Sequence, residues 1–244
     1  MTNLLELEEL TVRYGGVTAV DHVTVAVPEG SLFGLIGPNG AGKTTLIDAV
    51  TGLTKYSGSV SFGGQRIDRW KSHKRSHAGL VRTFQSLELF NELTVRENLQ
   101  TYAGIKLGDA AEEAVDWALE TMDVTWAADL YPSELSSGQA RLVSVARTLA
   151  ARPRLLLLDE PAAGLDAEES QWLGRRLRSL VGEGELTVLL VDHDVDLIMS
   201  VCDEILVLDF GRPIAHGGPA EVRADPAVGK AYLGSTGSDA LEAV

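Results

Sequence analysis

The chain has 244 residues, of which 45% are hydrophobic and 23% charged, and its formal net charge is −14 at pH 7. This length and composition suit a globular protein with a sizeable core, and they exclude disorder over most of the chain. The excess of 35 acidic over 21 basic residues argues against duplex DNA or RNA as the main partner, because such binding depends on neutralising phosphates. A nucleotide needs only a local positive site, so the net charge does not exclude it.

The apolar runs and the amino terminus indicate a cytoplasmic chain. Uninterrupted apolar runs such as 155–158 and 188–191 fall far short of the roughly 18 residues that span a bilayer. The first residues have neither the basic nor the apolar region of a signal peptide. The single cysteine, Cys202, excludes an internal disulfide and suits a reducing compartment.

The amino-terminal part of the chain predicts strands and then a helix. Two alternating runs are separated by the Gly15–Gly16 turn, and a short apolar strand then runs into glycine. A helix follows, because Leu46, Ile47 and Val50 fall on one helical face. The predicted strands here are 4–13, 19–27, 31–36, 58–62 and 80–84, and the predicted helix is 43–53.

The pattern turns helical from residue 91 to about residue 151 and then returns to strands. A helix is expected over 112–122, and Ser136 is a suitable N-cap for another helix. Apolar strands at 155–158, 186–191 and 205–208 are typical of a parallel sheet covered on both faces. A short helix is expected over 228–233, before a small, polar tail at 235–244 that we expect to be mobile. The chain therefore predicts an α/β core with a helical insertion.

The glycine-rich segment between the strand 31–36 and the helix 43–53 fits the phosphate-loop pattern. Its glycines let backbone N–H groups converge on an anion, and the helix N-terminus adds partial positive charge. Lys43 is expected to reach the β- and γ-phosphates, and the Thr44 hydroxyl to ligate Mg²⁺. The alternative is a glycine-rich turn without a ligand. The segment comprises Gly37, Pro38, Asn39, Gly40, Ala41, Gly42, Lys43, Thr44 and Thr45.

Two carboxylates follow the apolar strand 155–158. Strand alternation points the side chains of Asp159 and Glu160 in different directions. We expect Asp159 to hold Mg²⁺, through water, and Glu160 to orient or deprotonate the water that attacks the γ-phosphate. A solvated acidic turn is the alternative interpretation, and the phosphate loop upstream argues against it.

Several further motifs, together with the phosphate loop, resemble those of the ATP-binding cassette (ABC) proteins, from about residue 4 to residue 234. The run 135–139, Leu-Ser-Ser-Gly-Gln, resembles the LSGGQ signature of that family, with serine at 137 where the consensus has glycine. The resemblance makes Gln85 the Q-loop glutamine, Gly164-Leu165-Asp166 the D-loop, His193 the switch histidine and Tyr14 the aromatic residue that stacks on adenine.

The resemblance implies a fold and a working assembly. The fold is an α/β P-loop NTPase domain over 1–234, with a RecA-like core at about 1–90 and 152–218, an N-terminal antiparallel β subdomain, a helical subdomain at about 91–151 and a carboxy-terminal helix and tail at about 219–244. ATP and Mg²⁺ are the expected ligands, with Gln85 at the metal and His193, Gln85 and Glu160 catalytic. Ser136 and Gly138 start a helix, which is a natural anion site, and with Asp166 they would face the ATP of a second ATPase subunit. That subunit is the same chain or a related paralogue.

Within the family, the chain most resembles the ATPases of importers of branched-chain, or hydrophobic, amino acids. The stretches 82–98, 161–165 and 202–234 carry this resemblance, whereas residues 99–112 are shorter than usual in that group and Asp166 replaces a common asparagine. The implied partners are two membrane permease subunits and, indirectly, a solute-binding protein, on the cytoplasmic face of the membrane and without nucleic acid. Alternatives are the energy subunit of a lipid-extracting or urea and amide system, and a soluble cassette ATPase that transports nothing.

Basic residues between 55 and 82 form a locally positive stretch in this acidic protein. A solvated loop is the expected interpretation. A face for membrane lipid or for a permease is the alternative.

Overall fold

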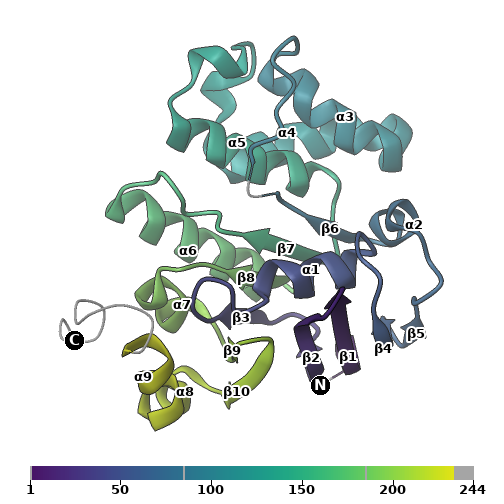
Figure 1. Ribbon diagram of the computed structural model, residues 1–244. Helices are drawn as coiled ribbons and strands as arrows, with labels where there is room; N and C mark the ends of the chain where they lie inside the picture. Colours follow the sequence, from purple (N-terminus) through teal and green to yellow (C-terminus); the bar gives the residue numbers. More distant parts are fainter. Residues whose placement is uncertain (1, 85, 185, 234–244) are drawn as a thin grey trace.

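Two sheets form the framework of the part of the chain that the computed structural model describes, residues 2–84, 86–184 and 186–233 (Figure 1). The first is antiparallel, in the order β2-β1-β4-β5, and the second has the order β10-β9-β3-β8-β7-β6. In the second sheet only the β9–β10 pair is antiparallel. The strands are β1 (Asn3–Tyr14), β2 (Val17–Pro28), β3 (Leu32–Ile36), β4 (Ser57–Phe62), β5 (Gln65–Arg66), β6 (Leu80–Arg82), β7 (Leu155–Asp159), β8 (Thr187–Val191), β9 (Glu204–Asp209) and β10 (Arg212–Gly217).

The helices lie around the second sheet. Figure 1 shows α3, α4 and α5 gathered beyond the β6 and β7 side of that sheet, and α8 and α9 beside β10, near the carboxy-terminal end of the chain. The helices are α1 (Lys43–Thr51), α2 (Ser72–His77), α3 (Val95–Leu107), α4 (Ala111–Thr121), α5 (Ser137–Ala150), α6 (Ala167–Gly182), α7 (Val195–Val201), α8 (Pro219–Ala224) and α9 (Pro226–Leu233). No helix among the described residues is both long and apolar enough to cross a membrane.

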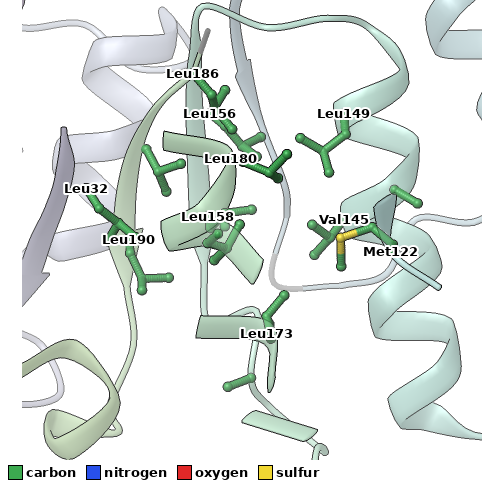
Figure 2. Packing of buried hydrophobic residues seen from close by; sticks show 14 of the residues in the cluster. Leu32, Met122, Val145, Leu149, Leu156, Leu158, Leu173, Leu180, Leu186 and Leu190 are labelled. Carbon is green, nitrogen blue, oxygen red and sulfur yellow. The ribbon is translucent and has the colours of Figure 1, made fainter. Parts of the chain in front are cut away.

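Each predicted strand is confirmed, and so is the parallel arrangement. Alternate residues of one strand enter two different hydrophobic clusters because side chains alternate across a sheet. Leu155 and Leu157 pack with α1 and the antiparallel sheet, whereas Leu156 and Leu158 pack with the helices. Figure 2 shows Leu156, Leu158 and Leu190 of the sheet together with Val145 and Leu149 of α5. Both faces are covered, so these strands are continuous apolar runs.

Several helices begin at a reciprocal cap between the N-cap residue and the residue three places later. The pairs are Thr94 with Glu97, Ser136 with Gln139, and Asp166 with Glu169. The predicted N-cap at Ser136 is confirmed. The helix α6 is absent from the predicted helices, although its capping pair is a recognised sequence signal for a helix start. The prediction for Asp166 is limited to the D-loop motif.

The expectation of a solvated loop at 55–82 is wrong for Arg75. This side chain is 2% exposed, and its guanidinium donates to the carbonyls of Ala49, Val50 and Ile67 at 3.0, 2.6 and 3.1 Å. Two of these carbonyls belong to the last turn of α1, where the regular helical donors run out. The Ala49 carbonyl also accepts from the N–H of Gly52 at 3.1 Å. Arg75 therefore closes the end of the helix that follows the phosphate loop.

Replacing Arg75 with methionine should lower the free energy of unfolding by about 2–4 kcal/mol, because it removes the buried, charge-assisted hydrogen bonds to the carbonyls of Ala49, Val50 and Ile67. The exposed Arg69, in the same stretch, provides a matched control. Arg69→Met should change the free energy of unfolding by less than about 0.5 kcal/mol. Urea unfolding of both variants checks this expectation, and equal effects would contradict the capping role of Arg75.

Candidate functional site

The phosphate-loop segment runs from the end of β3 to the first turn of α1, and neighbouring backbone fixes both of its ends. A Cβ on Gly37 would lie 2.1 Å from the carbonyl oxygen of Leu208. Gly42, the N-cap of α1, has φ of 100°, and its Cβ would lie 2.4 Å from the carbonyl oxygen of Ala19. Only glycine fits such close approaches of backbone to backbone. The predicted strand–loop–helix context is confirmed.

The ammonium group of Lys43 lies within the loop that precedes it. Its Nζ donates to the carbonyl of Gly37 at 2.6 Å and to that of Pro38 at 3.2 Å. Burial lowers the pKa of Lys43, and the negative charges of Glu160 and Asp159 act in the opposite direction. The lysine and the two carboxylates therefore share one electrostatic site. Thr44 and Thr45 follow in the first turn of α1, with Thr44 exposed.

Asp159 is the last residue of β7 and is 2% exposed. Its Oδ2 lies 3.3 Å from Nη2 of Arg82, and its backbone N–H donates to the Thr83 hydroxyl at 3.1 Å. Burial raises the pKa of the Asp159 carboxyl, and the positive charge of Arg82 opposes that shift. A carboxylate that is both buried and ion-paired is held in one place, as a metal ligand requires.

Glu160 occupies a left-handed backbone conformation, with φ of 51°. Its N–H donates to the carbonyl of Val191 at 2.7 Å, and its own carbonyl accepts from Ala163 at 3.2 Å. Non-glycine residues rarely adopt this conformation, and it is enriched at functional sites, where surrounding contacts hold the strain. The turn presents Glu160 directly after the buried strand.

The buried Asp192 connects the His193 segment to the turn after Glu160. Its Oδ2 accepts from the N–H of Ala162 at 3.2 Å, and its Oδ1 accepts from the N–H of Asp194 at 3.0 Å. Burial raises the pKa of Asp192, while those backbone donors oppose the shift. His193 is 67% exposed, with Nδ1 3.5 Å from Asp192 Oδ1.

The parallel register brings these segments to one edge of the sheet. Leu35 of β3 pairs with Val191 of β8, and Val191 pairs with Asp159 of β7. The phosphate loop, Glu160 and His193 each follow one of these strand ends. Ligands of open α/β sheets bind at this carboxyl edge. The structure thus brings together the predicted residues of the loop, the acidic pair and His193.

A second group of predicted residues surrounds the start of α5. The Ser136 Oγ accepts from the N–H of Gln139 at 3.2 Å, so this hydroxyl serves as a helix cap. A Cβ on the buried Gly138 would lie 3.2 Å from Leu165 Cδ2. The signature segment therefore packs against the 164–166 turn of the same chain. In that turn Asp166 Oδ1 accepts from the N–H of Glu169 at 2.8 Å.

Two predicted residues stand apart from these groups. Tyr14, at the end of β1, is 52% exposed, and its hydroxyl donates to Thr54 Oγ1 at 3.1 Å. Gln85 lies outside the described residues, between Phe84 and Ser86.

Several residues that support the site have no predicted role. They are Asp48, Arg82, Asp192 and Tyr232. Tyr232 of α9 is hydrogen-bonded to the backbone of Gly37, and burial raises the pKa of its phenol to about 12. Arg82 belongs to the stretch that we expect to be a solvated loop, and its 8% exposure shows that this expectation is wrong here as well. No local pattern marks these residues, because each also has a partner that is distant in the sequence.

Comparison with known proteins identifies relatives along nearly the whole chain. A family model described as "ABC transporter" matches residues 20–163, and one described as "Branched-chain amino acid ATP-binding cassette transporter" matches residues 212–237. A high-affinity branched-chain amino acid transport ATP-binding protein of Pseudomonas aeruginosa is 39% identical over 250 residues, covering 95% of this chain and 98% of the relative. A sulfate/thiosulfate import ATP-binding protein of Bradyrhizobium diazoefficiens is 39% identical over 232 residues, covering 91% of this chain and 66% of the relative.

Solved structures show the same fold. A nucleotide-free ATP-binding cassette from an ABC transporter superposes with a TM-score of 0.87 at 29% identity, covering 97% of this chain and all of that one. A structure of the ADP conformation of an ATP-binding cassette of an ABC transporter gives a TM-score of 0.87 at 30% identity, covering 96% of this chain and 100% of that one. With its phosphate loop and acidic strand end at one sheet edge, the chain belongs to the ABC transporter family, as the ATP-binding, ATP-hydrolysing subunit of an importer.

Proposed function

We propose that this chain powers an importer of branched-chain or other hydrophobic amino acids. The observation that carries the proposal is the match of residues 212–237 to the branched-chain amino acid cassette model, in addition to full-length relatives of that transport class. The sulfate/thiosulfate relatives have a similar sequence identity to this chain, at 39% and 37%, but the chain spans only about two thirds of their length. The carboxy-terminal segment therefore favours the amino acid class.

In the proposed mechanism, Lys43 leaves the carbonyls of its own loop and binds the β- and γ-phosphates of ATP. Glu160, held in its turn by Val191, orients the attacking water and accepts its proton. His193 and Gln85 complete the catalytic set, and Tyr14 stacks on the adenine. Backbone N–H groups of 37–45 surround the phosphates.

Thr44 and Asp159, with Gln85, are the residues proposed to hold Mg²⁺. The donor set fits this ion, because Mg²⁺ in nucleotide sites takes a hydroxyl or one or two carboxylates and completes its shell with phosphates and water. The buried, ion-paired Asp159 is such a carboxylate. Bound Mg²⁺ would neutralise charge on the phosphates.

Ser136, Gly138 and Asp166 are proposed to face the ATP of a second ATPase subunit, either another copy of this chain or a related one. The start of α5 supplies backbone N–H groups that can bind an anion. The ATP of the same chain is bound by its own phosphate loop, so this second anion site is available for the ATP of a partner subunit. The two subunits would bind two permease subunits at the cytoplasmic face of the membrane, and a solute-binding protein would act indirectly. The helical subdomain at 91–151 carries the signature in this arrangement.

Replacing Lys43 with alanine should reduce ATP turnover to less than about a tenth of the wild-type rate, because a charge aimed at the phosphates is lost from a partly desolvated site. Nucleotide binding should weaken as well. Lys71 is the exposed N-cap residue of α2, and Lys71→Ala is the control that should leave turnover unchanged. Phosphate release and ATP titration measure the two effects, and retention of turnover would argue against the phosphate-loop assignment.

The substitution Glu160→Gln should lower hydrolysis by about 10²–10⁴-fold while ATP affinity holds, because it removes only the basic oxygen. Glu168→Gln, at an exposed carboxylate of α6, is the matched control. The Glu160 variant should also elute as a dimer in Mg-ATP and as a monomer in ADP. An inactive variant that stays monomeric in ATP, with and without its partner subunit, contradicts the trapped-dimer mechanism.

The transported class is tested by co-expressing the chain with the permease and binding-protein genes beside it. In proteoliposomes, ATP-dependent uptake of radiolabelled leucine should exceed uptake of sulfate, because the carboxy-terminal segment matches the amino acid class. Incorporation of the Glu160→Gln subunit is the control and should abolish the uptake. Uptake of sulfate, or stimulation of ATPase activity by sulfate alone, would overturn the amino acid assignment.

A further inference from the structure

One buried arginine joins two carboxylates that come from different elements beside the phosphate loop. The Arg82 side chain, at the end of β6, is 7% exposed. Its Nη1 donates to Asp48 Oδ1, and its Nη2 lies 3.3 Å from Asp159 Oδ2. Its Nε donates to the carbonyl of Thr83 at 3.1 Å. Each nitrogen of the guanidinium therefore has an acceptor.

The two carboxylates belong to the two elements that carry the proposed Mg²⁺ ligands. Asp48 lies one helical turn after Thr44 in α1, so both side chains project from the same face of the helix. Asp159 is itself the proposed ligand at the end of β7. By binding Asp48 and Asp159, Arg82 links the helix that presents the Thr44 hydroxyl to the strand that presents the carboxylate.

Contacts around the guanidinium fix this link. The Thr83 hydroxyl accepts from the N–H of Asp159 at 3.1 Å, and the Thr83 N–H donates to the carbonyl of Leu157 at 2.9 Å. The ring of Phe84 lies 4.6 Å from the Arg82 guanidinium carbon. The end of β6 therefore holds both the backbone and the carboxylate of Asp159.

We propose that Arg82 is a positioning residue for the Mg²⁺ site, holding Thr44 and Asp159 in register through Asp48 and one carboxylate oxygen of Asp159. The proposal rests on the Mg²⁺ ligands proposed above. Binding both carboxylates at once requires a planar group with separate donors, which arginine has and lysine lacks. Groups that orient metal ligands typically contribute 10–100-fold to metal affinity.

The test measures binding of a fluorescent ATP analogue to the purified full-length chain while Mg²⁺ is titrated, and again in EDTA. Arg82→Met should raise the Mg²⁺ concentration at half-saturation by about 10–100-fold, with binding in EDTA unchanged. Arg82→Lys should raise it too, because one ammonium cannot reach all the acceptors. Arg66→Met is the matched control: its side chain is 68% exposed in an ion pair with Asp68, and the midpoint should not move.

A second variant decides the outcome if Arg82→Met does not fold. Asp48→Asn keeps the size of a side chain that is 31% exposed and removes only the charge on the α1 side of the link. A raised Mg²⁺ midpoint supports the proposal. An unchanged midpoint in the folded variants, with only lower stability, overturns it and leaves Arg82 a structural residue. If the wild-type chain binds the analogue equally well with and without Mg²⁺, the proposed set of Mg²⁺ ligands is wrong.

Discussion

The parallel register of β3, β8 and β7 is the constraint on which the site depends. Leu35, Val191 and Asp159 lie side by side on these strands, so the chain leaves all three strands at the same edge of the sheet. The loop before Lys43, the turn of Glu160 and the segment of His193 therefore meet without any long-range sequence signal. Apolar side chains on both faces stabilise that register, because a slip of one residue would exchange the two faces of each strand.

The charged side chains at this edge of the sheet each have a partner that offsets the cost of burying the charge. The Lys43 ammonium is held by carbonyls of its own loop, Asp159 by Arg82, and Asp192 by backbone donors from two segments. Removing charges from water is unfavourable unless partners are provided. The contacts of Asp159 and Asp192 restrict these carboxylates to single positions, whereas Lys43 would exchange its carbonyl partners for phosphates. A site that must accept a highly charged nucleotide gains pre-organisation from the same restriction.

Distant segments support the loop from outside. The N–H of Gly211 donates to the carbonyl of Ala41 at 2.9 Å, Gly37 approaches Leu208 closely, and Tyr232 is hydrogen-bonded to Gly37. These supports come from the segment 208–232, where the branched-chain amino acid cassette model also matches from residue 212. The part of the chain that favours the amino acid class thus also contacts the phosphate loop.

The sequence alone determined the fold class, eight of the strands and the phosphate-loop segment, because each is encoded within a short window by periodicity and glycine spacing. It did not indicate β5 or β10. The tertiary structure determined the contacts between residues that lie too far apart to share one such window. Arg75 and Arg82 look like parts of a charged, solvated stretch, yet both are buried, since their acceptors lie on α1 and β7. The start of the helix α6 is also encoded locally, in the capping pair of Asp166 and Glu169. The supports from Asp48, Asp192 and Tyr232 depend on pairs far apart in the chain, which only folding brings within hydrogen-bonding distance.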